Sequence, residues 1–341
     1  QAFLEGVTAS MKACGVRTEY WPKAELQRRC PYMNLDSFYP PKRVSDDTFG
    51  EPNGGCVEGA LFAPQSGYVN DPQLAARNLA DAAMRKGGDF RWGASVQRIE
   101  LDPTGRKVRG VSFTDGETVE APIVVNAAGP HSPAIHDLAF RGAKVPDDSI
   151  ITSRPLRVEV AYVREPPGSN LDKTLPVVLD SDTGVYYRPQ QGGTMVVGSV
   201  EPECDELQFL AHADELERKD GLSDEWTSYM YRAALRFPSL QIPNTATGLV
   251  AMYDVTEDWV PIYDRTPIGG FYSMRGTSGN QFKNAPVAGQ ICAQLVEGVE
   301  NGHDHDDKPL RMPLSRTSAS ISLELYSRLR SKRETTGSVL G

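Results

Sequence analysis

The sequence predicts a mixed α/β and α+β protein that combines an incomplete Rossmann-like sheet with a large antiparallel sheet. The Rossmann-like part is indicated by residues 123–132, where a β-branched run changes abruptly to the small residues Ala-Ala-Gly. Small side chains just beyond a buried strand let a ligand approach the backbone, because ligands lie outside the carboxyl ends of such strands. The antiparallel part is indicated by β-rich runs between residues 156 and 200, with Gly192-Gly193 as a hairpin turn.

Residues 123–132, taken alone, fit a core strand that ends in a tight turn equally well. The preceding elements favour a ligand-binding sheet. A helix is predicted to begin at Pro72, with Asn70 or Asp71 as its N-cap, and to end at Lys86-Gly87-Gly88. Short strands between residues 95 and 121 then form a small meander that leads into the strand at 123–125.

A second strand, turn and helix follow later in the chain. Residues 271–274 predict a short strand, residues 275–279 a glycine-bearing turn, and residues 285–296 a helix. This arrangement presents backbone N–H groups and a helix N-terminus to an anion or a ring carbonyl. The sequence further predicts helices over residues 1–14, 22–30, 205–236 and 316–333, and strands over residues 16–20 and 247–253.

Composition and charge restrict the possible partners. The 341 residues suffice for about two domains. The formal net charge is −9, from 36 Lys and Arg against 45 Asp and Glu. This balance argues against nucleic acid or an anionic membrane as the main partner, because both require a basic face. No apolar run approaches the roughly 18 residues of a membrane span.

The cysteine pattern indicates neither a disulfide framework nor a zinc site. The five cysteines are scattered without a C-x-x-C pair. We therefore expect a reducing compartment and predict a cytoplasmic protein. Residues 303–307, His-Asp-His-Asp-Asp, imitate a metal cluster but lack a third spaced ligand, so we interpret them as a solvated acidic loop and predict no metal.

Four stretches, in this order, resemble the FAD-dependent oxidoreductases of the D-amino-acid oxidase type, and most closely the branch of sarcosine oxidase, dimethylglycine dehydrogenase and glycine oxidase. The stretches are 67–72 with the following helix, 124–132, Tyr187-Arg188-Pro189 with Gly198-Ser199-Val200-Glu201, and Met252-Tyr253-Asp254-Val255-Thr256 through Ala285-Pro286. Together they span most of residues 55–300. Each piece is short, but their joint order is specific.

The resemblance implies an FAD cofactor and a set of residues that bind it. Ser95 and Val96 would lie by the adenine, and Ala127, Ala128 and Gly129 by the ADP part. The ribityl chain and flavin ring would lie beside Gly276, Thr277, Ser278, Gly279, Asn280, Gln281, Phe282 and Lys283. Small residues that permit close approach, and amides at a helix start, agree with this assignment.

The resemblance also indicates what this sequence lacks. The family's N-terminal β-α-β unit, with its G-x-G-x-x-G motif for the pyrophosphate, has no counterpart here. Because the sequence opens with Gln1 in a helical pattern, we expect the chain to begin partway into a larger protein. Without the missing unit we expect FAD binding to be weak or absent.

The resemblance implies three regions. The FAD-binding domain would be discontinuous, over residues 55–145 and 255–300, with its N-terminal part missing. The substrate domain, with the large antiparallel sheet, would comprise residues 1–54 and 146–254. Residues 301–341 would form a C-terminal tail and helix.

The implied reaction is oxidation of a C–N bond, in which a neutral secondary or tertiary amine or amino acid loses hydride to the flavin. Lys283 would anchor a substrate carboxylate, and Tyr253 would close the pocket or lie in the core. Arg275 would pair with substrate, with a flavin phosphate or within the protein. Tyr187 and Arg188, from the antiparallel sheet, would cover the site.

Departures from the family pattern refine this expectation. Ala251 stands where some members attach flavin covalently to a cysteine, so that linkage is excluded. Val196 aligns with a lysine thought to activate oxygen, which favours a dehydrogenase over an oxidase. Tyr253 aligns with the carboxylate-binding arginine of glycine oxidase, which favours an N-alkylated or imino acid over a primary amino acid. The electron acceptor is not indicated.

Two alternatives stay open at this stage. One is a flavin dehydrogenase of a hydroxy acid or polyol phosphate, although the matching stretches offer no candidate histidine as a base, because we interpret His131 in the stretch 124–132 as a packing residue. The other is a non-catalytic, flavin-free subunit, which the absent dinucleotide motif favours. The retained stretch from Gly276 to Lys283 argues against a flavin-free role.

Overall fold

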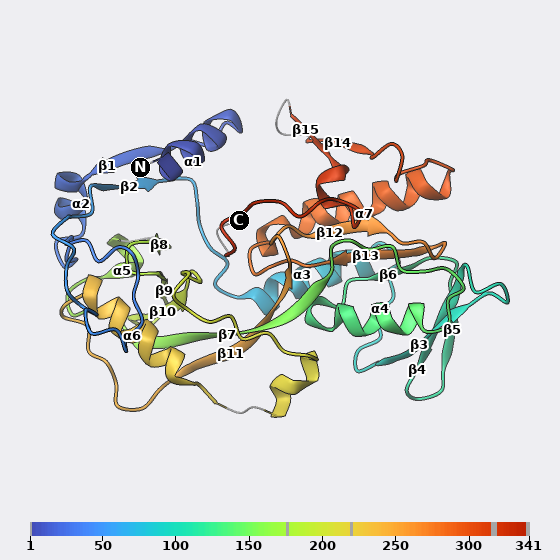
Figure 1. Cartoon of the computed structure of the whole chain (residues 1–341), viewed down its shortest axis with the longest axis horizontal. Coiled ribbons are helices and arrows are strands. Elements are labelled where there is room, and N and C mark those ends of the chain that lie inside the picture. The colour runs from blue at the N-terminus through green and yellow to red at the C-terminus, as the bar shows by residue number, and fades with distance from the viewer. Residues whose placement is uncertain (1, 175–176, 219–220, 315–318, 339–341) are drawn as a thin grey trace. The chain divides into compact units, whose positions relative to one another are not determined.

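The chain forms two units, each built from segments that are distant in sequence. The computed structural model describes residues 2–174, 177–218, 221–314 and 319–338 (Figure 1). Unit 1 comprises residues 1–88, 159–206 and 220–251, and unit 2 comprises residues 89–158, 207–219 and 252–341. Mixed α/β content with antiparallel sheets, as the sequence predicts, is confirmed.

Unit 1 is organised around a five-stranded sheet in the order β11-β7-β10-β9-β8. Its strands are β7 (Ser153–Arg164), β8 (Val178–Asp180), β9 (Val185–Gln190), β10 (Thr194–Ser199) and β11 (Gly248–Thr256). β10 pairs antiparallel with β7 and with β9, so that Val197 lies opposite both Ala161 and Tyr187. This is the predicted antiparallel sheet; β7 and β11 each have one end in unit 2.

Helix α6 (Asp224–Arg236) covers one face of this sheet. It begins at Ser223, whose hydroxyl accepts a hydrogen bond from the Glu225 N–H, and acidic residues occupy its first turn. Its buried side chains, Met230 and Ala233 among them, join the core of the sheet. The other elements of unit 1 are α1 (Ala2–Ala13), β1 (Glu19–Pro22), α2 (Lys23–Arg29), β2 (Gly59–Phe62), α3 (Pro72–Met84) and α5 (Leu171–Thr174).

The first segment of unit 1 ends at residue 88. Residues 55–88 lie in unit 1 because β2 pairs antiparallel with β1, with Trp21 opposite Ala60. Helix α3 begins as predicted at Pro72, and Asp71 is the N-cap whose carboxylate accepts the Leu74 N–H at 2.8 Å.

Unit 2 contains a three-stranded sheet in the order β12-β13-β6. The strands are β6 (Val124–Asn126), β12 (Ile262–Arg265) and β13 (Phe271–Arg275), and β13 runs parallel to β6 with Ser273 opposite Asn126. Because side chains alternate along β13, Phe271 packs with α4 (Ser132–Phe140) while Met274 packs with α7 (Ala285–Glu300). The two helices thus cover opposite faces of the sheet (Figure 1).

The remaining elements of unit 2 include the predicted meander, β3 (Val96–Leu101), β4 (Val108–Phe113) and β5 (Thr118–Glu120). They also include η1 (Gly129–His131), η2 (Ala213–Arg218), η3 (Phe282–Asn284), β14 (Arg311–Pro313), β15 (Ser320–Ser322) and η4 (Leu323–Tyr326). Two helix predictions are wrong for the described residues. Residues 207–210 are not helical because Phe209 bridges β7 at Leu156, and residues 320–333 form β15, the 3₁₀ helix η4, a turn at residues 328–330 and irregular chain.

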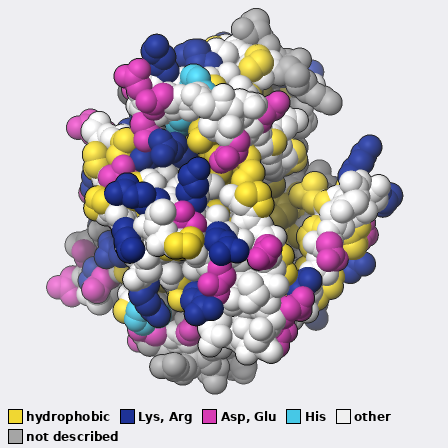
Figure 2. Space-filling model, turned by 90° about the vertical axis from the view of Figure 1, so that its right-hand side faces the viewer, with side chains coloured by type: hydrophobic (Ala, Val, Ile, Leu, Met, Phe, Trp, Pro, Cys, Tyr) yellow, Lys and Arg dark blue, Asp and Glu magenta, His cyan; other side chains and the backbone are white. Residues whose placement is uncertain are grey.

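The surface carries charges of both signs. On the face shown in Figure 2, Lys and Arg side chains are interspersed with Asp and Glu. Unit 2 also carries ion pairs at its surface, such as Arg91–Glu117 and Arg98–Glu100. The chain's net charge of −9 therefore does not make this face uniformly acidic. None of the described helices has both the length and the apolar composition that crossing a membrane requires.

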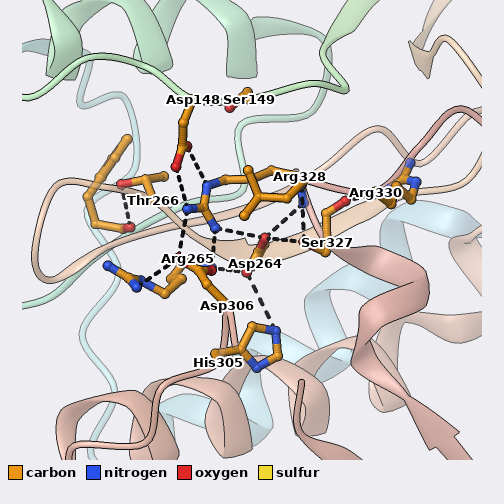
Figure 3. Close-up of polar contacts among 12 residues, drawn as sticks. Asp148, Ser149, Asp264, Arg265, Thr266, His305, Asp306, Ser327, Arg328 and Arg330 are labelled. Carbon is orange, nitrogen blue, oxygen red and sulfur yellow. Dashed lines mark hydrogen bonds and ion pairs between the residues drawn. The ribbon is translucent and has the colours of Figure 1, made fainter. Parts of the chain in front are cut away.

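Arg328 attaches the C-terminal segment to the rest of unit 2 (Figure 3). Its side chain is 2% exposed and bonds three carboxylates: Asp148 at 2.7 and 2.8 Å, Asp264 at 3.1 Å and Asp306 at 2.8 and 3.0 Å. Burial alone would lower the pKa of the guanidinium, but these carboxylates raise it above its ordinary value. The stretch predicted as a solvated acidic loop thus contributes the exposed Asp306 to the carboxylates around the buried Arg328, whereas His305 is itself buried beside Asp264.

We predict that Arg328→Met destabilises unit 2 by about 3–5 kcal/mol, because it leaves the fully buried Asp264 without its positive partner. Urea unfolding followed by fluorescence measures this change. The control is Arg98→Ala, which removes an exposed ion pair of the same unit and should change the unfolding free energy by less than about 1 kcal/mol. Equal effects of the two substitutions would contradict the assignment.

We also predict that stability falls in acid below about pH 4. Burial would raise the pKa of Asp258 and Asp306, but hydrogen bonds from Arg330 and Arg328 hold both pKa values below the ordinary value. A carboxylate with a lowered folded-state pKa stabilises the protein above its unfolded pKa, and this contribution is lost as pH falls. The slope of unfolding free energy against pH in this range should be smaller in Arg330→Met, and an unchanged slope would contradict this account.

Candidate functional site

The candidate site begins where β6 and β13 end. Because these strands are parallel neighbours, the loops after them leave the same edge of the sheet. After β6, Ala127 and Ala128 are exposed, and Gly129 has a φ of +56° with open space where a Cβ would stand. The predicted small-residue stretch thus leaves its backbone accessible.

The loop after β13 is a tight turn, residues 276–281, which we call the β13 turn. Gly276, Ser278 and Gly279 have φ values of +75°, +49° and +72°. A Cβ at Gly276 would lie 2.3 Å from Thr256 Cγ2, and one at Gly279 would lie 2.6 Å from the Tyr253 ring. Both positions therefore require glycine, for space as well as for φ.

The end of β11 holds the β13 turn in place. The Asp254 carboxylate accepts the Gly276 N–H, and the Asp254 backbone carbonyl accepts the Ser278 N–H at 2.7 Å. The Ser278 hydroxyl donates to the Gly276 carbonyl at 3.1 Å. Burial raises the pKa of Asp254, and its neighbours, Gly276 N–H foremost, only partly oppose the rise.

Two alternate N–H groups of this turn have no hydrogen-bond partner in the part of the chain that the structure describes. Those of Gly276 and Ser278 are bonded to Asp254, whereas those of Thr277 and Gly279 donate no hydrogen bond within the described residues. Free amides in a turn that contains left-handed residues form a concavity suited to negative charge. The turn can therefore receive an anionic or carbonyl oxygen.

Lys283 and Tyr253 both contact the β13 turn. Lys283 lies in η3, is exposed, and donates a hydrogen bond from Nζ to the Asn280 carbonyl. Desolvation by its neighbours lowers the pKa of the Lys283 ammonium. The ring of Tyr253 packs against Gly279. The structure thus brings two predicted substrate residues to one turn.

The other members of the predicted flavin stretch form a local chain of contacts. The Gln281 side-chain amide donates to Asn280 Oδ1 at 2.5 Å, and Asn284 donates to Gln281 Oε1 at 2.6 Å. Phe282 is 53% exposed. These polar contacts fix the entry into α7.

Arg275 lies on the face of β13 that α4 covers, with Ser273. It is 3% exposed, and neither its Nε nor Ser273 Oγ has a hydrogen-bond partner in the described part of the chain. Burial lowers the pKa of Arg275, and the carboxylates of Asp254 and Asp147 oppose this.

Ser95 and Val96 lie at the start of β3. Ser95 is exposed and its carbonyl accepts the Thr114 N–H at 3.0 Å, while Val96 packs against the core that contains Ile99 and Phe271. Among the described residues, no hydrogen bond joins the side chain of Ser95 or Val96 to another predicted site residue.

In unit 1, Tyr187 and Arg188 point to opposite faces of the sheet. Tyr187 is 1% exposed in the core against α6, where Phe237 contacts its ring and Thr183 its hydroxyl. Arg188 lies 5.2 Å from the Tyr68 ring on the other face, and its Nη1 is buried without a partner among the described residues. Tyr186, which sequence reasoning missed, shares this face with Arg188, and burial raises its pKa to about 12.

Sequence reasoning also missed Asp254. It directly follows Tyr253 in the stretch Met-Tyr-Asp-Val-Thr, but an isolated aspartate in a strand pattern does not indicate which turn it will contact. For Tyr186, the period-two alternation of strand β9 was the available signal.

We predict that Gly279→Ala lowers the unfolding free energy by about 2–4 kcal/mol, because alanine is strained at this φ and its Cβ would overlap the Tyr253 ring. Thermal or urea unfolding measures the change. The matched control is Gly289→Ala in α7, where nothing lies within 4 Å, and alanine should stabilise the helix by about 0.5–1 kcal/mol. Changes of the same sign would contradict the turn geometry.

Comparison with known proteins identifies the family. A model of the DAO family, FAD dependent oxidoreductase, matches residues 2–295. The chain is 26% identical over 288 residues to the sarcosine oxidase subunit beta of Arthrobacter sp., covering 84% of this chain and 61% of that protein. It is 24% identical over 303 residues to the D-amino acid dehydrogenase of Paramagnetospirillum magneticum, covering 86% of this chain and 65% of that protein.

Solved structures share the fold. The glycine oxidase of Geobacillus kaustophilus superposes with a TM-score of 0.65 at 19% identity, covering 96% of this chain and 71% of that one. The iminodiacetate oxidase of Chelativorans sp. BNC1 gives a TM-score of 0.63 at 18% identity, with 96% and 72% covered. This chain spans about three fifths of the length of the sarcosine oxidase subunit that it matches. On the family match and the shared fold, the chain belongs to the DAO family of FAD-dependent oxidoreductases.

Proposed function

We propose that this protein oxidises the C–N bond of a secondary or tertiary amine or amino acid, with FAD as the hydride acceptor. The observation that carries the proposal is the pair of open loops at the carboxyl ends of β6 and β13. One loop exposes Ala127 and Ala128, and the other is the β13 turn with its free amides. The family to which the chain belongs and its relatives support FAD as the cofactor.

The residues present fit part of a flavin nucleotide. Residues 127–129 would lie against the ADP part and the β13 turn against the flavin ring, with Ser95 and Val96 by the adenine. FAD, when bound, supplies the hydride acceptor. The protein would supply position and charge: free N–H groups of Thr277 and Gly279 would stabilise negative charge on the ring.

Lys283 would anchor a substrate carboxylate beside the β13 turn. Its ammonium is the cation that the structure places at this turn, and Tyr253 packs on the same glycine. The names of related proteins, sarcosine oxidase and iminodiacetate oxidase, agree with an amine or amino-acid substrate.

Arg188 in unit 1 is a further candidate for binding an anionic group. Its guanidinium lies beside the ring of Tyr68, and its buried Nη1 has no hydrogen-bond partner among the residues that the structure describes. Val196, which pairs with Arg188 across the sheet, occupies the aligned position of the oxygen-activating lysine, so we infer a dehydrogenase rather than an oxidase. The five unpaired cysteines support a reducing, cytoplasmic compartment.

The first test is the visible absorption spectrum of the purified protein before and after denaturation. Released FAD would support the proposal. Failure to hold or take up FAD is the outcome that the missing G-x-G-x-x-G motif by itself predicts, and it would overturn the proposal for this chain and leave the flavin-free alternative. Turnover of N-methyl amino acids with an artificial electron acceptor but not with oxygen would support the dehydrogenase assignment.

We predict that Lys283→Met raises KM for an N-methyl amino acid by about 10- to 100-fold with a smaller effect on kcat, because it removes a charge-assisted contact to the carboxylate. Steady-state kinetics measures both constants. An N-methyl amine without a carboxylate serves as the control substrate and should be affected little. The control variant is Lys308→Met, an exposed lysine in the loop after α7. Equal losses with both substrates would argue against carboxylate anchoring.

A further inference from the structure

Asp254 is a buried carboxylate whose second oxygen is unused by the turn it holds. The residue is 1% exposed, and its Oδ2 accepts the Gly276 N–H. Its Oδ1 has no hydrogen-bond partner at normal distance among the described residues, although the nearby Ser153 hydroxyl lowers the pKa of this carboxylate; the Nε of the adjacent buried Arg275 also has no partner among them. A buried charge without a full set of partners destabilises a protein, so its presence requires a compensating role.

The β13 turn depends on the hydrogen bonds that Asp254 accepts from Gly276 and Ser278, and we call these two contacts the clamp. Three of its first four residues have positive φ, and one of them, Ser278, is not glycine. A serine at φ +49° persists only where surrounding contacts over-determine the backbone. Asp254 supplies two of these contacts, one from its carboxylate and one from its carbonyl.

The clamp selects which amides are free. Asp254 binds the N–H groups of Gly276 and Ser278 and leaves those of Thr277 and Gly279 without a protein partner. A hydrogen bond to a carboxylate is stronger than one to a neutral acceptor. Loss of the carboxylate would free the Gly276 amide and let the turn adopt other conformations.

We propose that Asp254 is the positioning residue of the flavin site: it fixes the β13 turn so that the Thr277 and Gly279 amides face the flavin. The flavin part of this inference rests on the proposed function. The clamp itself rests on the geometry alone. The experiment therefore measures amide protection in the turn and binding of FAD separately.

The first readout is amide hydrogen exchange of residues 275–281 in the full chain. Asp254→Ala should raise exchange at Gly276 and Ser278 about tenfold or more, because one amide loses its acceptor and the turn loosens. Asp254→Asn keeps an oxygen acceptor for Gly276 and should retain most of the protection. If Asp254→Ala does not fold, Asp254→Ser takes its place, since serine is too short to reach the Gly276 amide.

The matched control is Asp264→Asn, which alters an equally buried aspartate of unit 2 that accepts hydrogen bonds from Ser327, Arg328 and the Arg265 N–H. It should lower the unfolding midpoint and leave exchange in the β13 turn unchanged. This separates a loss of global stability from a loss of the clamp.

The second readout is FAD itself, by fluorescence titration and by the visible spectrum of the bound flavin. Asp254→Ala should weaken FAD binding about 10- to 100-fold and shift the spectrum, whereas Asp254→Asn and Asp264→Asn should stay near the wild type. If the wild type binds no FAD, the proposed function fails, while the exchange data still decide the clamp. Unchanged exchange in Asp254→Ala, or equal losses in the Asn and Ala variants, would overturn the role of Asp254.

Discussion

The parallel pairing of β6 with β13 is the constraint on which the candidate site depends. These two strands are far apart in sequence but run side by side in the same direction. The loops that follow them therefore leave the sheet at the same edge. Neither loop is a site by itself. The small residues after β6 permit close approach, and the turn after β13 adds free amides, so a nucleotide would meet both kinds of surface together.

The second requirement is a rigid support behind the turn. The end of β11 provides it through a carboxylate, a backbone carbonyl, the Tyr253 ring and the Thr256 methyl group. Gly276 and Gly279 are required because a Cβ at either position would overlap β11 side chains, and Asp254 supplies hydrogen-bond acceptors for the turn. Strain at positive φ is thereby placed where a ligand needs fixed amides, which is where backbone strain is most often found in proteins.

Buried arginines fasten distant segments within each unit. In unit 1, Arg236 bonds Asp180 and Asp182, and Arg232 bonds Asp205. In unit 2, Arg328 and Arg330 hold the C-terminal segment to β12 and to Asp258. Removing one member of such a pair would leave an uncompensated charge in the core and so destabilise the unit.

Elements whose ends and periodicity depend on neighbouring residues could be predicted from the sequence. The Asp71 cap with Pro72, the antiparallel strands of residues 153–199, and the strand–turn–helix at residues 271–300 follow from periodicity, capping and turn residues. The glycines of the β13 turn and its neighbour Lys283 could also be named from the sequence, because their pattern resembles a family.

Which of the predicted residues lie near one another depends on contacts that the sequence pattern does not specify. Tyr187 and Arg188 point to opposite faces of strand β9, and only Tyr187 lies in the core. Arg275 is buried on the face of the sheet that α4 covers, and so does not lie at the open edge. The predicted C-terminal helix gave way to an extended segment, since Arg328 finds its partners in Asp148, Asp264 and Asp306 and not within a helix. Asp254 is recognisable only once β11 lies against the β13 turn. These outcomes depend on contacts between residues distant in sequence, which local propensity does not encode.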